Sequence, residues 1–209
     1  MYHFTVPMAL IDYLPVIFFG VTAVLLLRDL YNKMFKGAYA LLAAGSVNVF
    51  LAGFCKATWK LLYAAGICNF VALEEMFMPV NSLGLLFVGL SLIGMLIWKR
   101  KSAVLSVAPP VFASSMPFIM MMVLGLGGLC VGLSILSAKM KKGKFMVLFI
   151  LSFVCAMAMG YMSSQDSTQN WVNWVEQSIN TISQACLMLG VIALHRNGLK
   201  DWTWEGAAV

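Results

Sequence analysis

Two lysines stand one helical turn apart inside a long apolar stretch. Lys56 and Lys60 flank Trp59 in the sequence FCKATWKLLYAAG, which covers residues 54–66. An ammonium group in apolar surroundings either reaches toward lipid headgroups or faces a partner inside the protein. Lys56 and Lys60 are therefore interface anchors in one interpretation, and a paired or ligand-binding cluster in the other.

Acidic residues offer partners for these lysines. Asp12 begins the first apolar segment, and Glu74 and Glu75 precede the third. A carboxylate paired with Lys56 or Lys60 would close a vestibule at this end of the protein. Such a vestibule carries both signs of charge, so the sequence predicts a site for a zwitterionic or polar solute.

Uncharged polar residues extend this candidate site toward the middle of the chain's helices. Asn48 lies near the centre of a predicted helix over 38–64, where a polar side chain faces protein or a cavity rather than lipid. It either makes a hydrogen bond between helices or lines a polar path. The other predicted lining residues are Asn81, Ser152, Glu176, Gln177, Asn180, Thr181 and Gln184.

Metal and cofactor chemistry is not expected. The five cysteines show no CxxC or CxxH spacing, and the two histidines, His3 and His195, lie at opposite ends of the chain. The sixteen methionines are interpreted as adaptable apolar filling. The GLGG sequence at 125–128 follows no predicted strand, so it indicates close helix packing or a flexible point rather than a nucleotide loop.

The composition is that of a polytopic membrane protein. Only 11% of residues are charged and 62% are hydrophobic, with a mean hydropathy of +0.90. A soluble domain carries roughly 25% charged residues. The first residues lack a basic region followed by an apolar core, so a cleavable signal peptide is not expected. We expect one transmembrane domain over 1–209.

Apolar windows predict an all-α protein with seven transmembrane helices. The helices are expected at about 7–28, 38–64, 78–98, 102–114, 116–138, 145–163 and 170–195. The charge-free stretch 102–138 contains Pro109, Pro110 and Pro117, and basic sequences flank it on both sides. Because basic flanks stay cytoplasmic, it should cross an even number of times. A re-entrant hairpin, leaving six full helices, is the alternative.

The charge distribution predicts the orientation. With two crossings in 102–138, all of the fourteen basic residues except Lys56 and Lys60 lie on the cytoplasmic side. The acids Asp12, Glu74, Glu75, Asp166 and Glu176 lie on or near the outside. The net charge of +6 is then a topology signal, so nucleic acid is not expected as a partner. We expect an outside N-terminus, a cytoplasmic C-terminus and a bacterial inner membrane.

A faint internal duplication accompanies this topology. KMFKG at 33–37 matches KMKKG at 139–143, and YLPVIFFG at 13–20 is similar to SMPFIMMM at 115–122. Asn81 and Asn180 occupy equivalent places near the outer ends of two later helices. The expected division is a first three-helix repeat at 1–98, a linker helix at 102–115, a second repeat at 116–196 and a cytoplasmic tail at 197–209.

This 3+1+3 arrangement resembles the SWEET and PQ-loop transporters, including bacterial nicotinamide riboside transporters. The resemblance lies in the paired Pro15 and Pro117 and the paired Asn81 and Asn180; no Pro-Gln dipeptide opens a helix. The Trp-x-x-Trp of NWVNWVEQ at 170–177 is also similar to one in the riboside transporters, although an aromatic belt explains Trp171 and Trp174 equally. No lysine occurs in 170–195, so a retinal protein is not expected.

Three functions are compatible with this sequence. The resemblance implies a small polar-solute transporter or facilitator that works by alternating access of two three-helix bundles. A membrane-embedded sensor or accessory protein acting through protein contacts is the first alternative, and an intramembrane lipid-modifying enzyme is the second. No catalytic spacing is present, so an enzyme is not favoured. The expected partners are membrane lipids, a small polar solute and, as an option, further copies of the chain.

Overall fold

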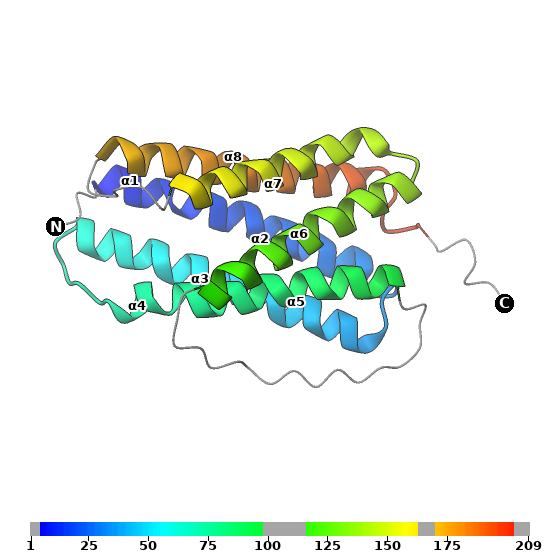
Figure 1. Cartoon of the computed structure of the whole chain (residues 1–209), viewed down its shortest axis with the longest axis horizontal. Helices are drawn as coiled ribbons and strands as arrows, with labels where there is room; N and C mark the ends of the chain where they lie inside the picture. The colour runs from blue at the N-terminus through cyan, green and yellow to red at the C-terminus, as the bar shows by residue number, and fades with distance from the viewer. Residues whose placement is uncertain (1–4, 98–115, 163–169, 203–209) are drawn as a thin grey trace.

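The described part of the protein is entirely helical. The computed structural model describes residues 5–97, 116–162 and 170–202. In order along the chain, the helices are α1 (Val6–Ile11), α2 (Tyr13–Leu30), α3 (Lys36–Ala64), α4 (Ala72–Glu75), α5 (Phe77–Ile97), α6 (Met116–Lys139), the 3₁₀ turn η1 (Gly143–Phe145), α7 (Met146–Met162) and α8 (Asn170–Arg196). Figure 1 shows the long helices side by side in one elongated bundle.

Pro15 explains where the first apolar segment breaks. A proline has no amide hydrogen, and its ring clashes with the carbonyl of the residue four positions earlier. For Pro15 that residue is Ile11, where α1 ends. The chain turns at Asp12 and continues as α2, with Pro15 in the first turn, where a proline is tolerated. The break leaves the Asp12 side chain buried at the junction of the two helices.

Glycines set the packing and the direction of the central helices. Gly89 and Gly128 of α5 and α6 lie against each other. Gly125 lies against Leu85, and Gly132, two turns later, lies against Leu92. Because the residue numbers rise together along both helices, α5 and α6 run parallel. Gly45 of α3 lies against Val88 of α5, whereas Val49 of α3 lies against Gly84 of α5. The residue numbers run in opposite directions, so α3 and α5 are antiparallel. Small residues allow such close backbone approach without side chains between.

The helices form a closed ring in sequence order. α2 packs on α3, α3 on α5, α5 on α6, α6 on α7 and α7 on α8, and α8 returns to pack on α2. α2, α3 and α5 are therefore contiguous, as are α6, α7 and α8. The two groups meet at α5–α6 and at α8–α2.

Six helical segments of the described part are long and apolar enough to cross a membrane. They are Val6–Leu30, Lys36–Ala64, Ala72–Ile97, Met116–Lys139, Gly143–Met162 and Trp171–Arg196. The helix expected at 116–138 is confirmed as α6. The linker helix expected at 102–115 lies outside the described residues, so seven crossings stay a prediction. Because α5 and α6 are parallel, α5 ends and α6 begins at opposite ends of the bundle.

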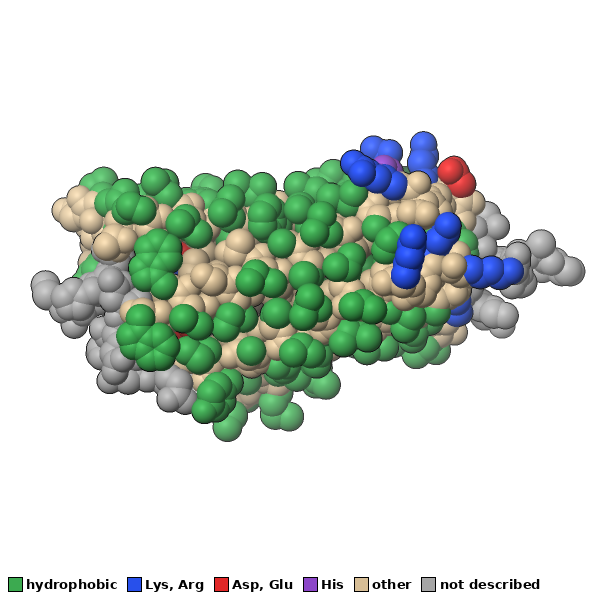
Figure 2. Space-filling view, turned by 90° about the horizontal axis from the view of Figure 1, so that it is seen from above, with side chains coloured by type: hydrophobic (Ala, Val, Ile, Leu, Met, Phe, Trp, Pro, Cys, Tyr) green, Lys and Arg blue, Asp and Glu red, His purple; other side chains and the backbone are tan. Residues whose placement is uncertain are grey.

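Basic side chains gather at one end of the bundle. Arg28, Lys33, Lys139, Lys144 and Arg196 all lie at or beyond helix ends that meet there, which we call the basic end. We call the opposite end, where α1 joins α2, the Asp12 end. Figure 2 shows lysines and arginines at the basic end and hydrophobic side chains along the length between the two ends. This exposed apolar belt is what a membrane-spanning bundle presents to lipid.

The glycine contacts generate a stability prediction. A Cβ at Gly125 would overlap backbone atoms of Leu85 and Leu86, which cannot move aside as a side chain can. We expect Gly125→Ala to destabilise the bundle by about 2 kcal/mol or more, as overpacking does. The measurement is thermal unfolding in detergent.

Gly160→Ala is the matched control. Gly160 is also a helical glycine, but no atom lies within 4 Å of the position of an added Cβ. Alanine is the better helix former, so this variant should melt at or slightly above the wild-type temperature. Equal melting of the two variants would show that the α5–α6 contact is looser than the structure has it.

Candidate functional site

A buried ion pair joins α2 to α3 at the Asp12 end. Lys60 Nζ lies 2.6 Å from Asp12 Oδ2, and the two side chains are only 18% and 8% exposed. Beside this pair, Tyr13 and Thr58 hydroxyls lie 2.9 Å apart. The prediction that a lysine of this cluster pairs with Asp12 is confirmed for Lys60. The ammonium group of Lys60 thus faces a carboxylate inside the protein, as the paired interpretation expects.

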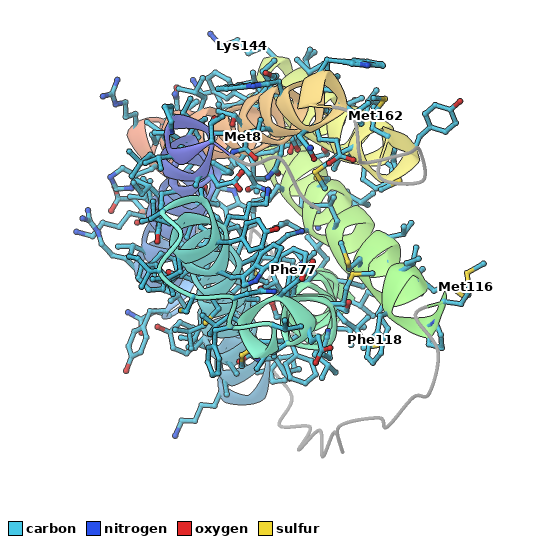
Figure 3. The ribbon with its side chains drawn as sticks, turned by 90° about the vertical axis from the view of Figure 1, so that its left-hand side faces the viewer. Met8, Phe77, Met116, Phe118, Lys144 and Met162 are labelled. Atoms are coloured by element: carbon cyan, nitrogen blue, oxygen red, sulfur yellow. The ribbon has the colours of Figure 1, made fainter. Side chains whose placement is uncertain are left out.

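Lys56 lies one turn deeper and has different surroundings. Its Nζ lies 4.1 Å from the centre of the Phe77 ring, in a cation–π contact between α3 and α5. The charges of Asp12, Glu176 and Glu74 attract it, and that of Lys60 repels it. Within the described part of the chain, no carboxylate makes a direct ion pair with Lys56. Phe77 lies in the interior of this end, whereas Met116 lies at its edge (Figure 3).

A polar stripe of α8 faces the same end. Glu176 and Asn180 are one turn apart, and Gln177 and Gln184 are two turns apart, so all four lie on neighbouring rows of the helix. Because α2 and α8 run to the same end and Asp29 pairs with His195, Gln177 lies at about the depth of Asp12. The stripe therefore reaches the depth of Asp12, and the charge of Glu176 acts on Lys56.

Two amide atoms of this stripe are buried without a hydrogen-bond partner among the described residues. Gln177 is 6% exposed, and its Nε2 has no hydrogen-bond partner among the described residues; the same is true of Gln184 Oε1. An unpaired buried polar group costs roughly 1–3 kcal/mol. The buried groups are thus a donor on Gln177 and an acceptor on Gln184, two helical turns apart, and a polar solute could satisfy either of them.

The predicted asparagines are less closely grouped. Asn81 is buried on the face of α5 that carries Phe77 and Gly84, which packs on α3. Asn48 is half-buried on α3. It lies between Ala44, one turn earlier, which is exposed, and Ala52, one turn later, which is buried. None of Asn48, Asn81 and Asn180 makes a side-chain hydrogen bond within the described residues. Their shared polar path stays a prediction.

The structure separates residues that lie close together in the sequence. Glu75 is exposed, and it is Glu74 that acts on Lys56. Trp59, between the two lysines, does not face lipid as an interface anchor would: it is 2% exposed and donates from Nε1 to Asn69 Oδ1 at 2.9 Å. Trp171, in contrast, is largely exposed at the start of α8, as a belt residue would be.

A second charged cluster, at the basic end, was not expected. His195 Nδ1 lies 2.7 Å from Asp29 Oδ2, and the Asp29 side chain is fully buried. Asp29 Oδ1 has no hydrogen-bond partner in the described part. The one signal in the sequence was an acid next to Arg28, at the end of the first apolar segment, where the neighbouring charges Arg28, Lys33 and Lys36 are all basic. The pair joins α2 to α8, and so joins the two groups of helices.

Lys33, in the turn after α2, binds the start of the predicted tail. Its Nζ donates to the backbone carbonyls of Lys200 at 2.7 Å and Trp202 at 2.6 Å. Leu199 is fully buried in the core. Burial lowers the pKa of Lys33 from its usual value, while the charges of Asp201 and Asp29 oppose the shift. The expected tail at 197–209 is thus packed on the bundle as far as Trp202.

No protein-family model matches the chain, and comparison with curated proteins and with solved structures found no match. The resemblance to SWEET and PQ-loop transporters therefore stays an expectation, and the case for function depends on the arrangement of these side chains.

The Asp12–Lys60 pair yields a prediction for stability. Removing one partner leaves an uncompensated charge in a largely buried place, so Asp12→Asn and Lys60→Met should each destabilise by about 2 kcal/mol or more. The double variant should recover part of this loss, because no charge is then left behind. Thermal unfolding in detergent measures all three.

Glu75→Gln is the control for this cycle. Glu75 is exposed and makes no ion pair in the described part of the chain, so its variant should melt like the wild type. If the single and double variants of Asp12 and Lys60 show additive losses, the two side chains do not interact.

The contact of Lys33 with the tail yields a second prediction. Lys33→Met removes both hydrogen bonds to residues 200 and 202, and the backbone amides of 199–202 should exchange with deuterium about tenfold faster. Lys200→Met is the control, because that side chain is exposed and only its backbone carbonyl accepts from Lys33. Unchanged exchange in Lys33→Met would mean that the buried Leu199 alone holds the segment.

Proposed function

We propose that the protein transports or facilitates passage of a small polar solute that carries both an acidic and a basic group. The observation that carries this proposal is the cluster at the Asp12 end: Lys56, which has no ion-pair partner among the described residues, Glu74 and Glu176 near it, and the unpaired atoms Gln177 Nε2 and Gln184 Oε1. Ionisable groups within apolar helices are costly and mark solute or ion pathways more often than packing.

Each group has a role in this site. The Lys56 ammonium binds a solute carboxylate, and the Phe77 ring holds the ammonium in place from the other side. Glu176 and Glu74 favour a solute ammonium. Gln177 and Gln184 offer one donor and one acceptor that a hydroxyl or amide satisfies. The Asp12–Lys60 pair beside them keeps the local charge balanced and closes the site toward that end.

The arrangement of helices supports alternating access. α2, α3 and α5 repeat the directions of α6, α7 and α8, as an internal duplication of three helices requires. The two groups meet mainly at two interfaces of the described residues, α5–α6 and α8–α2, about which they can rock. The Asp29–His195 pair holds the α8–α2 interface together at the basic end and must separate when that end opens.

We place the basic end in the cytoplasm, because basic segments of membrane proteins stay inside. The N-terminus is then outside, and the candidate site is reached from the outer face. The crossing at 102–115 completes the 3+1+3 arrangement, and the bacterial inner membrane is the proposed location.

The test is a thermal-shift screen of the detergent-purified full chain. The panel contains amino acids, other zwitterions, amines, carboxylates, sugars and nucleosides. A solute at a hundredfold its dissociation constant should stabilise by about 2.7 kcal/mol. A zwitterion should raise the melting temperature, and Lys56→Met should abolish that rise.

Lys36→Met is the matched control for Lys56, since Lys36 is an exposed lysine at the other end of the same helix. It should keep the full ligand-induced shift. If no solute class raises the melting temperature, or if Lys56→Met keeps the shift, the proposed site is wrong, and a sensor or accessory role through protein contacts becomes the better account.

A further inference from the structure

A groove lies on the lateral surface of the bundle, near the basic end. It has a volume of about 480 Å³ and is lined by Val24, Leu27, Arg28, Tyr31, Asn32 and Tyr39. These residues come from the last turns of α2, the turn after it and the first turn of α3. The groove is separate from the cluster at the Asp12 end.

The lining changes in character along the groove. Val24, Leu27, Arg28 and Tyr31 follow helical spacing, so they form one stripe along α2. Val24 and Leu27 are one turn deeper in the apolar belt than Arg28 and Tyr31. The rings of Tyr31 and Tyr39 meet edge to face, with centroids 5.1 Å apart, and form one wall. The groove is thus apolar toward the middle of the bundle and polar toward its basic end.

Arg28 is the charged group of this groove. Its side chain is 57% exposed, and Nε lies 3.8 Å from Asp29 Oδ1, which is beyond hydrogen-bond distance. Arg28 makes no hydrogen bond within the described residues. Asp29 is instead oriented by His195 at 2.7 Å. The guanidinium donors of Arg28 remain available to an anion.

We propose that this groove binds an anionic phospholipid. Arg28 binds the headgroup phosphate with its planar set of donors, and Asn32 and the tyrosine hydroxyls add hydrogen bonds. One acyl chain lies on Val24 and Leu27. The gradient from apolar to basic along α2 matches the order of chain and headgroup in a bilayer leaflet. Basic pockets with interfacial tyrosines on the cytoplasmic side suit anionic headgroups. This proposal does not depend on the proposed transport function.

The test is native mass spectrometry of the full chain in detergent, titrated with phosphatidylglycerol and with phosphatidylcholine of the same acyl chains. The wild type should bind phosphatidylglycerol about tenfold more tightly. Arg28→Gln should remove this preference. Arg196→Gln should keep it, because Arg196 is an exposed arginine at the same end but outside the groove. An equal loss in both variants would mean a general attraction to the basic end and would overturn the site.

Two further arms keep the proposal testable if Arg28→Gln folds poorly. Val24→Trp fills the groove from a largely exposed position without changing charge, and it should weaken phosphatidylglycerol binding about tenfold. Unchanged binding would sink the proposal. Glycerol 3-phosphate, which has the phosphate but no chain, should not compete at the same concentration. If it competes as well as the lipid, the groove takes free phosphate and the lipid assignment is wrong.

Discussion

The structure depends on the parallel contact of α5 with α6, where backbone meets backbone at Gly89 and Gly125. Helices in lipid satisfy their own hydrogen bonds, so their association comes from close packing rather than from burial away from water. A side chain at either glycine would force the helices apart. The contact makes the second group of helices repeat the directions of the first. It therefore also decides that the basic segments after α2, α6 and α8 meet at one end.

The two acids of α2 are each held by a partner on another helix. Asp12 pairs with Lys60 of α3, which lies in the same group of helices, and Asp29 pairs with His195 of α8, which lies in the other. Buried pairs add little net stability, because desolvation offsets the attraction, but they disfavour any arrangement that separates them. α2 is thus tied to its own group at one end and to the opposite group at the other. In the proposed alternating access, only the Asp29–His195 pair has to separate.

The cluster at the Asp12 end is poorly optimised for stability. Lys56 contacts an aromatic ring, and Gln177 Nε2 and Gln184 Oε1 are buried without hydrogen bonds within the described residues. Apolar residues in their place would remove the cost of unpaired polar groups. Buried polar groups without partners are expected at functional sites, where residues are retained for binding at a cost in stability. The groove at Arg28 differs, because it faces the surroundings and its apolar lining is ordinary for a surface in lipid.

Hydropathy and the helix-breaking effect of proline act over a few neighbouring residues. The sequence alone therefore determined the positions of the long helices and the concentration of lysines and arginines near their ends. It also narrowed the partners of Lys60 to a few carboxylates. Only the tertiary structure decided that Asp12 is the partner, that Trp59 is buried, and that Asp29 meets His195. These outcomes depend on which helix faces meet and at what depth. Contacts between glycines far apart in the chain set the facing and the depth of the helices, and these contacts cannot be predicted from a local pattern of hydrophobic residues.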